Sequence, residues 1–438
     1  MNLAHGLGGG SDLPIPAAYA IAGGGAALTL SFVILLLAWR TPRFDKSDAG
    51  LEMPGWFTQA VDSQALAVTL RAVGLLFAGF LVWVSIAGKD LLTNPAFGLV
   101  YVWLWVGLIP VSLLFGPVLK AMSPVRTLHL LLARATGEDP DSGLAKMPAR
   151  LGYWPAAVGL FAFVWLELVY PDATYLSSLR LWFAGYVAAM LIGALYYGSS
   201  WLARADPFEV YSTLVAHLSV WGRRSDGVLV LRNPLANLDR VRAGPGLVAV
   251  VAILLGSTAF DSFRSSNAWL RWTQTTTASV PVIDTVLLAG MCLFVGLAFV
   301  TATMATGVDG KFRRAELPAM FAHSLVPIIV GYMVAHYLTF FVETGQATLI
   351  LVSDPLSNGS NLFGTANWEV NYWLSEHPTL LASIKVLAIV TGHILGAVAA
   401  HDRALQVLPK RHQATGQLPL LAVMVLYTFS GLYLLFGV

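Results

Sequence analysis

The stretch FAHSLVPIIVGYMVAHYLTFFVETGQ runs from Phe321 to Gln346 and consists mostly of apolar residues. An α-helix needs about 20 consecutive apolar residues to cross the hydrocarbon core of a bilayer, so this stretch predicts a membrane span. It nevertheless contains two histidines and ends near a glutamate. Ionisable side chains inside a membrane cost about 2.5–3.5 kcal/mol each on insertion scales, which indicates that these residues have a function or a specific partner.

The rest of the chain has the same character. Of its 438 residues, 57% are hydrophobic and only 11% are charged, whereas a typical soluble domain has about 25% charged residues. The mean hydropathy is +0.69. This composition excludes an ordinary soluble enzyme and predicts one all-α, polytopic transmembrane bundle over residues 1–438. A single cysteine, Cys292, excludes a disulfide framework and any metal cluster held by several cysteines.

Ten apolar segments are long enough to span a bilayer. The sixth is short, and we expect it to continue past its nominal end. The predicted spans are residues 16–39, 64–87, 96–118, 151–170, 178–199, 246–260, 281–306, 317–342, 379–400 and 417–437.

The positions of the basic residues support this count. Loops that follow the first, third, fifth, seventh and ninth segments contain 20 of the 26 Lys and Arg residues. Because loops on the cytoplasmic side are enriched in Lys and Arg, both termini are predicted to lie outside the cytoplasm. The glycine-rich residues 1–16 have no cleavable signal pattern, so the first span is expected to be an uncleaved anchor.

Three segments outside the spans have recognisable patterns. A short amphipathic helix is expected around Phe208–Leu218, and an interfacial helix with arginines on its polar side around Arg126–Arg134. Both basic loops are expected to contact anionic lipid. A phosphate or nucleotide site is the alternative, although no glycine-rich phosphate loop is present, and no nucleic acid partner is predicted. The external loop 343–378 contains TLILVSDPL, which is expected to be a short strand or a re-entrant piece. Its aromatic residues suit a lid lying on the membrane interface.

Six ionisable residues fall at one depth, within about two helical turns of the external surface. They come from five different spans, and scattered accidents would not share a depth. They are Glu167, Asp261, Asp284, His336, Glu343 and Lys385.

The Phe321–Gln346 helix places some of these groups on one face. At about 100° per residue, a stripe about 60° wide contains Tyr332, His336, Thr339 and Glu343. His323 lies about 220° away from His336 and nearer the cytoplasm, although a kink at Pro327 would change that angle.

His323 matches instead the depth of His393 on the next helix. Facing histidines on neighbouring helices are able to ligate a haem or a metal. The alternatives are two hydrogen-bonded core histidines or a proton relay.

The outer group of six also has two interpretations. In the structural one, Lys385 pairs with a carboxylate and locks the helices together. In the functional one, excess negative charge is balanced by protons or by a divalent ion such as zinc or copper, with His336, Glu343 and Asp284 as metal ligands. Water activated by that ion would react with help from Glu343, Asp261 and Glu167. Lys385 would then stabilise the developing oxyanion.

Several long phrases of the chain resemble a known family, the fenitrothion hydrolase-like group of polytopic bacterial, mainly actinobacterial, membrane proteins. The phrases are AHGLGGGSDLPIP, WLELVYP, DPFEVYSTLVAHLSVWGRR, RNPLANL, STAFDSF, HSLVPIIVGYMVAHY and SDPLSNGSNLFGT, and together they span nearly the whole chain. The resemblance implies a multi-pass protein of the bacterial cytoplasmic (plasma) membrane and cleavage of an organophosphate triester. It supplies no catalytic residue.

Three functional hypotheses follow. The first is a membrane-embedded, metal-assisted hydrolase whose external-leaflet site takes an apolar ester or organophosphate-like substrate from the lipid. The second is a proton- or ion-coupled transporter that uses the same carboxylates and Lys385. The third is a redox protein with haem or copper at His323 and His393, served by an external redox or metal-delivery partner. No GxSxG, HExxH or Walker motif is present.

Overall fold

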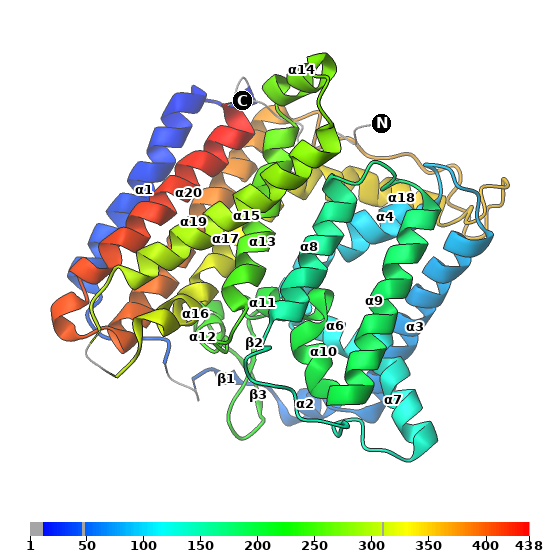
Figure 1. Ribbon diagram of the computed structural model, residues 1–438, viewed down its shortest axis with the longest axis horizontal. Coiled ribbons are helices and arrows are strands. Elements are labelled where there is room, and N and C mark those ends of the chain that lie inside the picture. Colours follow the sequence, from blue (N-terminus) through cyan, green and yellow to red (C-terminus); the bar gives the residue numbers. More distant parts are fainter. Residues whose placement is uncertain (1–11, 46–48, 309–310, 438) are drawn as a thin grey trace. The chain divides into compact units, whose positions relative to one another are not determined.

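The computed structural model describes residues 12–45, 49–308 and 311–437 (Figure 1). The prediction that the N-terminal residues have no cleavable signal pattern concerns residues 1–16, and residues 1–11 of these lie outside the described part of the chain. The chain forms two compact units, and each combines segments that are distant in sequence. Unit 1 is Met1–Lys46, Leu238–Glu343 and Asn371–Val438, and unit 2 is Ser47–Asn237 and Thr344–Val370.

Unit 1 is a bundle of long apolar helices. Two short helices and several single turns connect them. The long helices are α1 (Ala17–Ala38), α13 (Leu247–Arg264), α15 (Val280–Met304), α17 (Val326–Thr339), α19 (Pro378–Val407) and α20 (Leu418–Phe436). The short elements are α14 (Asn267–Thr275), α16 (Leu317–Phe321), a π-helical turn (Phe340–Thr344) and 3₁₀ turns at Arg314–Glu316, Ala322–Leu325, Lys410–His412 and Thr415–Gln417.

Helix α17 is the most enclosed long helix of this unit. It packs against α13 and α19, and α19 in turn packs against α1 and α20. Glycines permit the close approach of α17 and α19. A Cβ atom added at Gly331 would lie 2.4 Å from the carbonyl oxygen of Ala388, and one at Gly392 would lie 2.5 Å from that of Pro327. Small residues at a helix–helix interface let two backbones come together in this way.

Unit 2 is also helical, with shorter and more broken elements. Helix α5 continues from a π-helical turn, and the pair is bent by 44°. The helices are α2 (Gly55–Val61), α3 (Gln64–Ala87), α4 (Pro95–Gly98), α5 (Leu108–Phe115), α6 (Val118–Met122), α7 (Pro124–Thr136), α8 (Trp154–Leu168), α9 (Leu176–Tyr197), α10 (Ser199–Ala205), α11 (Pro207–Ala216), α12 (Pro234–Leu238) and α18 (Gly345–Leu351), and the π-helical turn is Leu99–Leu104.

A small antiparallel sheet joins three short segments of unit 2. Its strand order is β1-β3-β2, where β1 is Leu51–Glu52, β2 is Trp221–Arg223 and β3 is Leu229–Leu231. Val230 on the central strand is fully buried and pairs with both Glu52 and Gly222.

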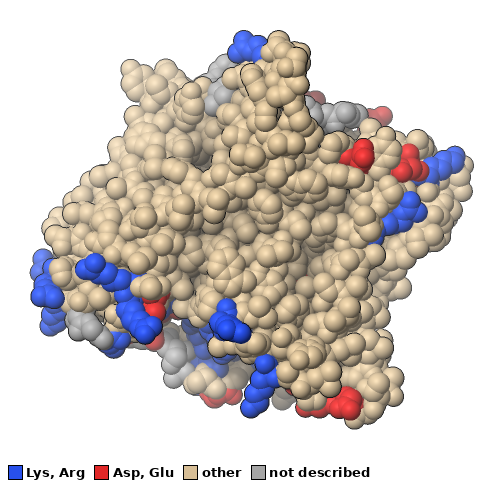
Figure 2. Space-filling view, in the orientation of Figure 1, with Lys and Arg blue, Asp and Glu red and all other residues tan. Residues whose placement is uncertain are grey.

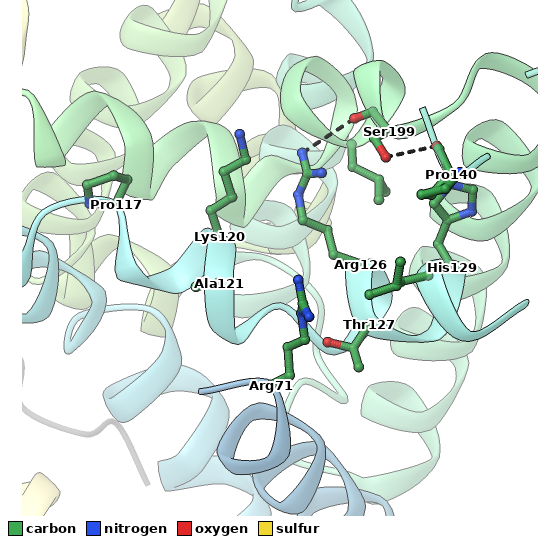
Figure 3. A pocket seen from close by; sticks show the side chains of 11 residues that line it. Arg71, Pro117, Lys120, Ala121, Arg126, Thr127, His129, Pro140 and Ser199 are labelled. Carbon is green, nitrogen blue, oxygen red and sulfur yellow. Dashed lines mark hydrogen bonds between the residues drawn. The ribbon is translucent and has the colours of Figure 1, made fainter. Parts of the chain in front are cut away.

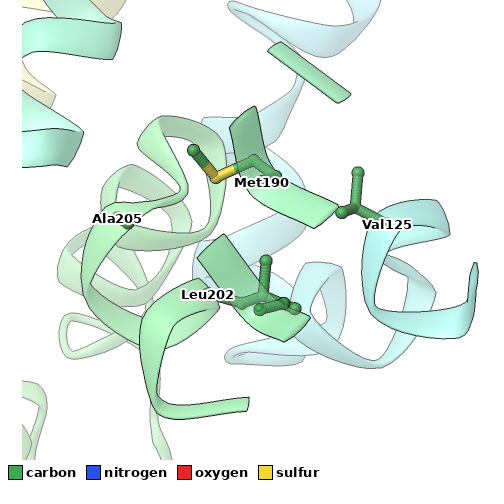
Figure 4. Close-up of a cluster of buried hydrophobic side chains, with 5 residues drawn as sticks. Val125, Met190, Leu202 and Ala205 are labelled. Atoms are coloured by element: carbon green, nitrogen blue, oxygen red, sulfur yellow. The ribbon is translucent and has the colours of Figure 1, made fainter. Parts of the chain in front are cut away.

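Helix α7, which is predicted to be interfacial, is held by an apolar cluster (Figure 4). Val125 on α7 packs with Met190 and Ala194 on α9 and with Leu202 and Ala205 on α10. All five side chains are buried. Ser123 caps the N-terminus of α7, because its hydroxyl accepts a hydrogen bond from the backbone N–H of Arg126. The position of this helix is therefore set by packing and by capping.

The helices indicate a multi-pass membrane protein. Within the part of the chain that the structure describes, eight helices are long and apolar enough to cross a membrane, or nine if the bent pair that ends in α5 is one span. Helix α8 is apolar but has only 15 residues. Every predicted span overlaps one of these elements, while the count of ten and the side of the termini stay predictions. On the face drawn in Figure 2, the middle is almost entirely uncharged and Lys and Arg lie toward its margins.

The structure refines three predictions about individual elements. The sixth span extends through Arg264, as expected for a segment that continued past its nominal end. The helix expected around Phe208–Leu218 exists as α11, but it is buried over nearly its whole length and has no solvent face. The TLILVSDPL stretch begins as helix α18, so the strand alternative was wrong.

Candidate functional site

Helices α13 and α17 bring together five polar side chains in unit 1. Asp261 and Ser262 lie in the last turn of α13, and Tyr332, His336 and Tyr337 lie on α17. All five are almost completely buried, with exposed fractions of 4% or less. Buried polar groups are costly unless they are hydrogen-bonded, so the contacts among these five residues decide whether the site is stable.

The five side chains form one continuous hydrogen-bonded chain, called here the polar relay. The hydroxyl of Tyr332 donates to Oγ of Ser262 at 2.9 Å, and that oxygen lies 3.1 Å from Nδ1 of His336. Nε2 of His336 lies 2.8 Å from Oδ2 of Asp261. The hydroxyl of Tyr337 donates to the same carboxylate oxygen at 2.8 Å. The relay therefore runs from Tyr332 to Tyr337 without a gap.

The hydrogen positions along the relay have two consistent arrangements. With a neutral imidazole, Nε2–H donates to the carboxylate of Asp261, and Nδ1 accepts from the hydroxyl of Ser262. With an imidazolium, both ring nitrogens donate, and the hydroxyl of Ser262 donates to the backbone carbonyl of Thr258 at 3.1 Å. The two arrangements differ by one proton. The relay can therefore gain or lose a proton while the contacts among its five residues are kept, and only the hydroxyl hydrogen of Ser262 changes its acceptor.

The charge of the His336–Asp261 pair follows from this difference. An aspartate beside an imidazolium has no net charge, whereas an aspartate beside a neutral imidazole has a net charge of −1. A net charge inside a bilayer is expensive, and the two forms of the pair differ in that charge. Within the described residues no set of three or more His, Cys, Asp or Glu side chains is placed to hold a metal ion.

The predicted stripe on α17 is only partly retained. Tyr332 and His336 belong to the relay. Thr339, which follows them on the same helix, is buried, and its hydroxyl has no hydrogen-bond partner among the described residues. Glu343 lies beyond α17 in the π-helical turn Phe340–Thr344, where it accepts a hydrogen bond from Ser375. A π-helical turn has a wider i→i+5 pattern, so residues after it no longer follow the 100° spacing of the α-helix.

Asp284 has a different partner from the one predicted. Its carboxylate lies 3.2 Å from Nε of Arg264, so it forms an ion pair with the end of α13. The side chain of Asp284 is 1% exposed, whereas that of Arg264 is 37% exposed. Its second oxygen has no hydrogen-bond partner among the described residues. A cation therefore pairs with this buried carboxylate, but it is Arg264 and not Lys385, which the structural interpretation had named.

Lys385 and Glu167 lie in separate surroundings. Lys385 on α19 is 1% exposed and interacts electrostatically with Asp12, which precedes α1. Glu167 on α8 belongs to unit 2, where it interacts electrostatically with Tyr101 and Tyr211. The structure thus provides partners for both groups, and the proposed roles of Lys385 and Glu167 in catalysis stay predictions.

His323 and His393 are both buried, each with an exposed fraction of 2%. Nδ1 of His323 lies 3.1 Å from the carbonyl oxygen of Met320, and Nδ1 of His393 lies 2.9 Å from that of Ile389. A carbonyl oxygen only accepts, so each ring is protonated on Nδ1.

That tautomer leaves Nε2 as the ligating atom, which is the arrangement of most metal-bound histidines. Nε2 of His393 has no hydrogen-bond partner among the described residues. The 3₁₀ turn that carries His323 packs directly on α19, which carries His393. The chemistry of this pair therefore fits a haem or a metal.

Unit 2 contains a second buried polar group that was not predicted. Nη2 of Arg126 donates to Oε1 of Glu209 at 2.6 Å, and Nε of Arg126 contacts the other oxygen. Asp206 caps α11 by accepting from the backbone N–H groups of Phe208 and Glu209, and it accepts from the hydroxyl of Tyr186 at 2.9 Å. Burial, together with the nearby charge of Glu209, raises the pKa of Asp206 to about 6.

Two members of the relay, Ser262 and Tyr337, were missed from the sequence. Each is the direct neighbour of a predicted residue, Asp261 or His336, and that adjacency was the available signal. No family model, curated protein or solved structure matches this chain.

Proposed function

We propose that this protein moves protons within the membrane, as a proton-coupled carrier does. The observation that supports the proposal is the polar relay, a five-residue hydrogen-bonded chain enclosed by apolar helices. Histidine and carboxylate side chains inside membrane helices are typical of proton pathways in pumps and transporters. Histidine suits this task because its charge changes near neutral pH.

The central step is a proton transfer between known atoms. A proton that arrives at Ser262 moves to Nδ1 of His336 as the ring gives up its Nε2 proton to Asp261. The neutral carboxyl then gives its proton to water or to the coupled substrate, which restores the carboxylate, and the ring returns to its first tautomer after rotation. Within the relay, each step moves one proton between two hydrogen-bonded heavy atoms. No covalent bond to a substrate forms. The tyrosines at both ends orient the relay, since their hydroxyls donate to Ser262 and to Asp261.

A flux measurement tests the proposal. The full chain is placed in vesicles that contain a pH-sensitive dye, and a potassium diffusion potential set with valinomycin drives proton movement. Wild-type protein is expected to acidify or alkalinise the lumen faster than protein-free vesicles, in the direction set by the potential. Asp261→Asn and His336→Gln are expected to abolish that difference. His377→Gln, which changes an exposed histidine outside the relay, is the matched control. Equal flux in wild type and Asp261→Asn would remove the proposal.

A hydrolase is the second candidate, and one feature favours it. Ser262, His336 and Asp261 follow one another in the order that activates a serine nucleophile: hydroxyl, imidazole, carboxylate. Oγ of Ser262 would form a bond to the acyl or phosphoryl centre while its proton goes to His336. His336 would then protonate the leaving group as its bond to the acyl or phosphoryl centre breaks. A water molecule deprotonated by His336 would hydrolyse the Ser262 ester, release the acid and restore the serine hydroxyl. A fluorophosphonate probe distinguishes the candidates, because labelling that disappears in Ser262→Ala supports hydrolysis.

The metal-assisted reaction and the haem or copper hypothesis remain predictions with simple tests. Metal analysis of the purified protein measures whether an ion copurifies and whether His336→Ala and Glu343→Ala remove it. An absorption spectrum with a Soret band that is lost in His393→Ala would support haem at His393.

A further inference from the structure

Unit 2 has a pocket of about 400 Å³ that is separate from the polar relay of unit 1 (Figure 3). Three basic side chains reach it from three helices: Arg71 from α3, Lys120 from α6 and Arg126 from α7. The carbonyl of Pro140 and the first residue of α10, Ser199, complete one side. The serine hydroxyl donates to the Pro140 carbonyl at 2.9 Å, which fixes that wall.

The pocket keeps a positive charge. Arg126 is neutralised by Glu209, with which it forms a two-pronged ion pair. Arg71 and Lys120 form no ion pair with any acid in residues 12–45, 49–308 or 311–437. Two uncompensated cations that line one cavity attract an anion, and guanidinium and ammonium groups are the usual partners of phosphate.

A buried histidine adds a directional polar contact. His129 lines the pocket and is only 3% exposed. Its Nε2 lies 3.0 Å from the carbonyl oxygen of Pro140, so Nε2 carries the hydrogen of that contact. Nδ1 has no hydrogen-bond partner among the described residues. A buried nitrogen without a partner is rare in proteins and indicates an absent ligand or water. In this tautomer Nδ1 accepts, so its natural partner is a hydroxyl.

The helix that carries Arg126 and His129 also presents an apolar side. Leu128, Leu131 and Leu132 of α7 are exposed by 38%, 48% and 43%. At the first turn of the helix, Val125 is held by the apolar cluster with α9 and α10 (Figure 4). Exposed leucines beside a basic pocket are typical of a helix that lies in the headgroup region of a membrane.

We propose that this pocket binds a phosphate group that carries a hydroxylated substituent, as in the headgroup of phosphatidylglycerol. Arg71 and Lys120 bind the phosphate oxygens, and Nδ1 of His129 accepts from a headgroup hydroxyl. The leucines of α7 contact the acyl chains. Glycerol phosphate in free form has the same chemistry, and the two sources differ only in those acyl chains.

Native mass spectrometry of the full chain in detergent tests the site. The protein is titrated with phosphatidylglycerol, with phosphatidylcholine, with phosphatidic acid, and with glycerol phosphate alone. Phosphatidylglycerol is expected to bind more tightly than phosphatidylcholine. The double variant Arg71→Gln with Lys120→Gln is expected to lower its affinity by about twenty-five-fold, because each basic contact contributes about fivefold. His129→Phe, which keeps the ring volume, is expected to reduce the preference for phosphatidylglycerol over phosphatidic acid.

The matched control is Lys89→Gln with Arg180→Gln, which removes two exposed basic residues of the same unit that lie outside the basic loops and do not line the pocket. It is expected to leave the affinity unchanged. Glycerol phosphate that binds as tightly as the lipid would assign the site to the free anion. Equal losses in the pocket and control variants, or no preference over phosphatidylcholine, would overturn the proposal. Tryptophan fluorescence and elution volume verify that each variant is folded.

Discussion

Nε2 of His336 lies 2.8 Å from Oδ2 of Asp261, and both side chains are almost wholly enclosed by helices of unit 1. The contact joins residues that are 75 positions apart in the chain. It therefore couples the last turn of α13 to the last turn of α17. A buried pair of this kind is stable only while both partners are present, because the loss of one leaves the other without compensation.

Replacement of His336 is expected to be more damaging than replacement of Asp261. His336→Ala leaves a buried carboxylate with Tyr337 as its remaining relay partner and is expected to cost about 3–5 kcal/mol of unfolding free energy. Asp261→Asn keeps an acceptor for both hydrogen bonds and is expected to cost about 1–3 kcal/mol. The double variant should be less destabilised than the sum. Unfolding of the detergent-solubilised chain by SDS, followed by circular dichroism, measures the three values. Additive effects would show that the two side chains are not coupled.

Tyr337→Phe is expected to slow proton flux while the fold is retained. The substitution removes one hydrogen bond to Asp261 and no carbon atoms, so its cost in stability is about 1 kcal/mol. The matched control is Tyr427→Phe, which removes the bond from another buried tyrosine to the carbonyl of Val295. Flux in dye-loaded vesicles should fall only for Tyr337→Phe. A similar fall in both variants would indicate a general effect of buried tyrosines.

Glu209→Ala is expected to destabilise unit 2 by about 3–5 kcal/mol, because Arg126 would lose a buried carboxylate partner. Glu209 is 3% exposed in this pair. The ion pair of Arg223 with Asp62 is the comparison, since both of its side chains are more than 40% exposed. Asp62→Ala is expected to cost less than about 1 kcal/mol. Thermal unfolding of both variants measures whether the buried ion pair contributes more to the unfolding free energy than the exposed one.

Asp206 predicts a pH dependence of stability. Its pKa is about 6 in the folded chain and about 3.9 in an unfolded one, so protonation favours the fold. The stabilisation is fully present below about pH 4 and is lost as the pH rises through about 6. The change amounts to at most about 3 kcal/mol.

Asp206→Asn does not titrate and keeps an acceptor for the cap of α11. The unfolding free energy of wild type relative to this variant should therefore fall between about pH 4 and pH 6 and stay constant above about pH 7. A difference that is constant over the whole range would contradict the raised pKa.

Gly392→Val is expected to separate α17 from α19. Even the first carbon of the new side chain would lie 2.5 Å from the carbonyl oxygen of Pro327, so the helices must move apart. A loss of several degrees in melting temperature is expected. Gly290→Val on α15, where an added Cβ has no neighbour within 4 Å, is the matched control.

The sequence was sufficient to predict the helices, because apolar runs of span length have one physical interpretation. It also placed Asp261 and His336 at the same depth. It did not predict that they touch, since hydropathy does not determine which helices are neighbours.

Where the structure departs from the predictions, the causes are local. Glu343 left the stripe because a π-helical turn intervenes. Helix α11 is buried although Asp206 and Glu209 lie at its N-terminal end, because each carboxylate has a hydrogen-bond partner. The sequence does not show which residues these partners are.

The glycine contacts between α17 and α19 have a mechanical consequence. Two backbones that meet at Gly331 and Gly392 have no side chains there to interlock, so sliding along the interface meets little steric resistance. Helix α17 carries His336, and α13 carries Asp261. A shift of α17 by about 1 Å away from α13 would stretch their 2.8 Å contact beyond hydrogen-bond range. A small movement of α17 along its glycine contact with α19 would therefore be enough to break the hydrogen bond between His336 and Asp261 and to interrupt the polar relay.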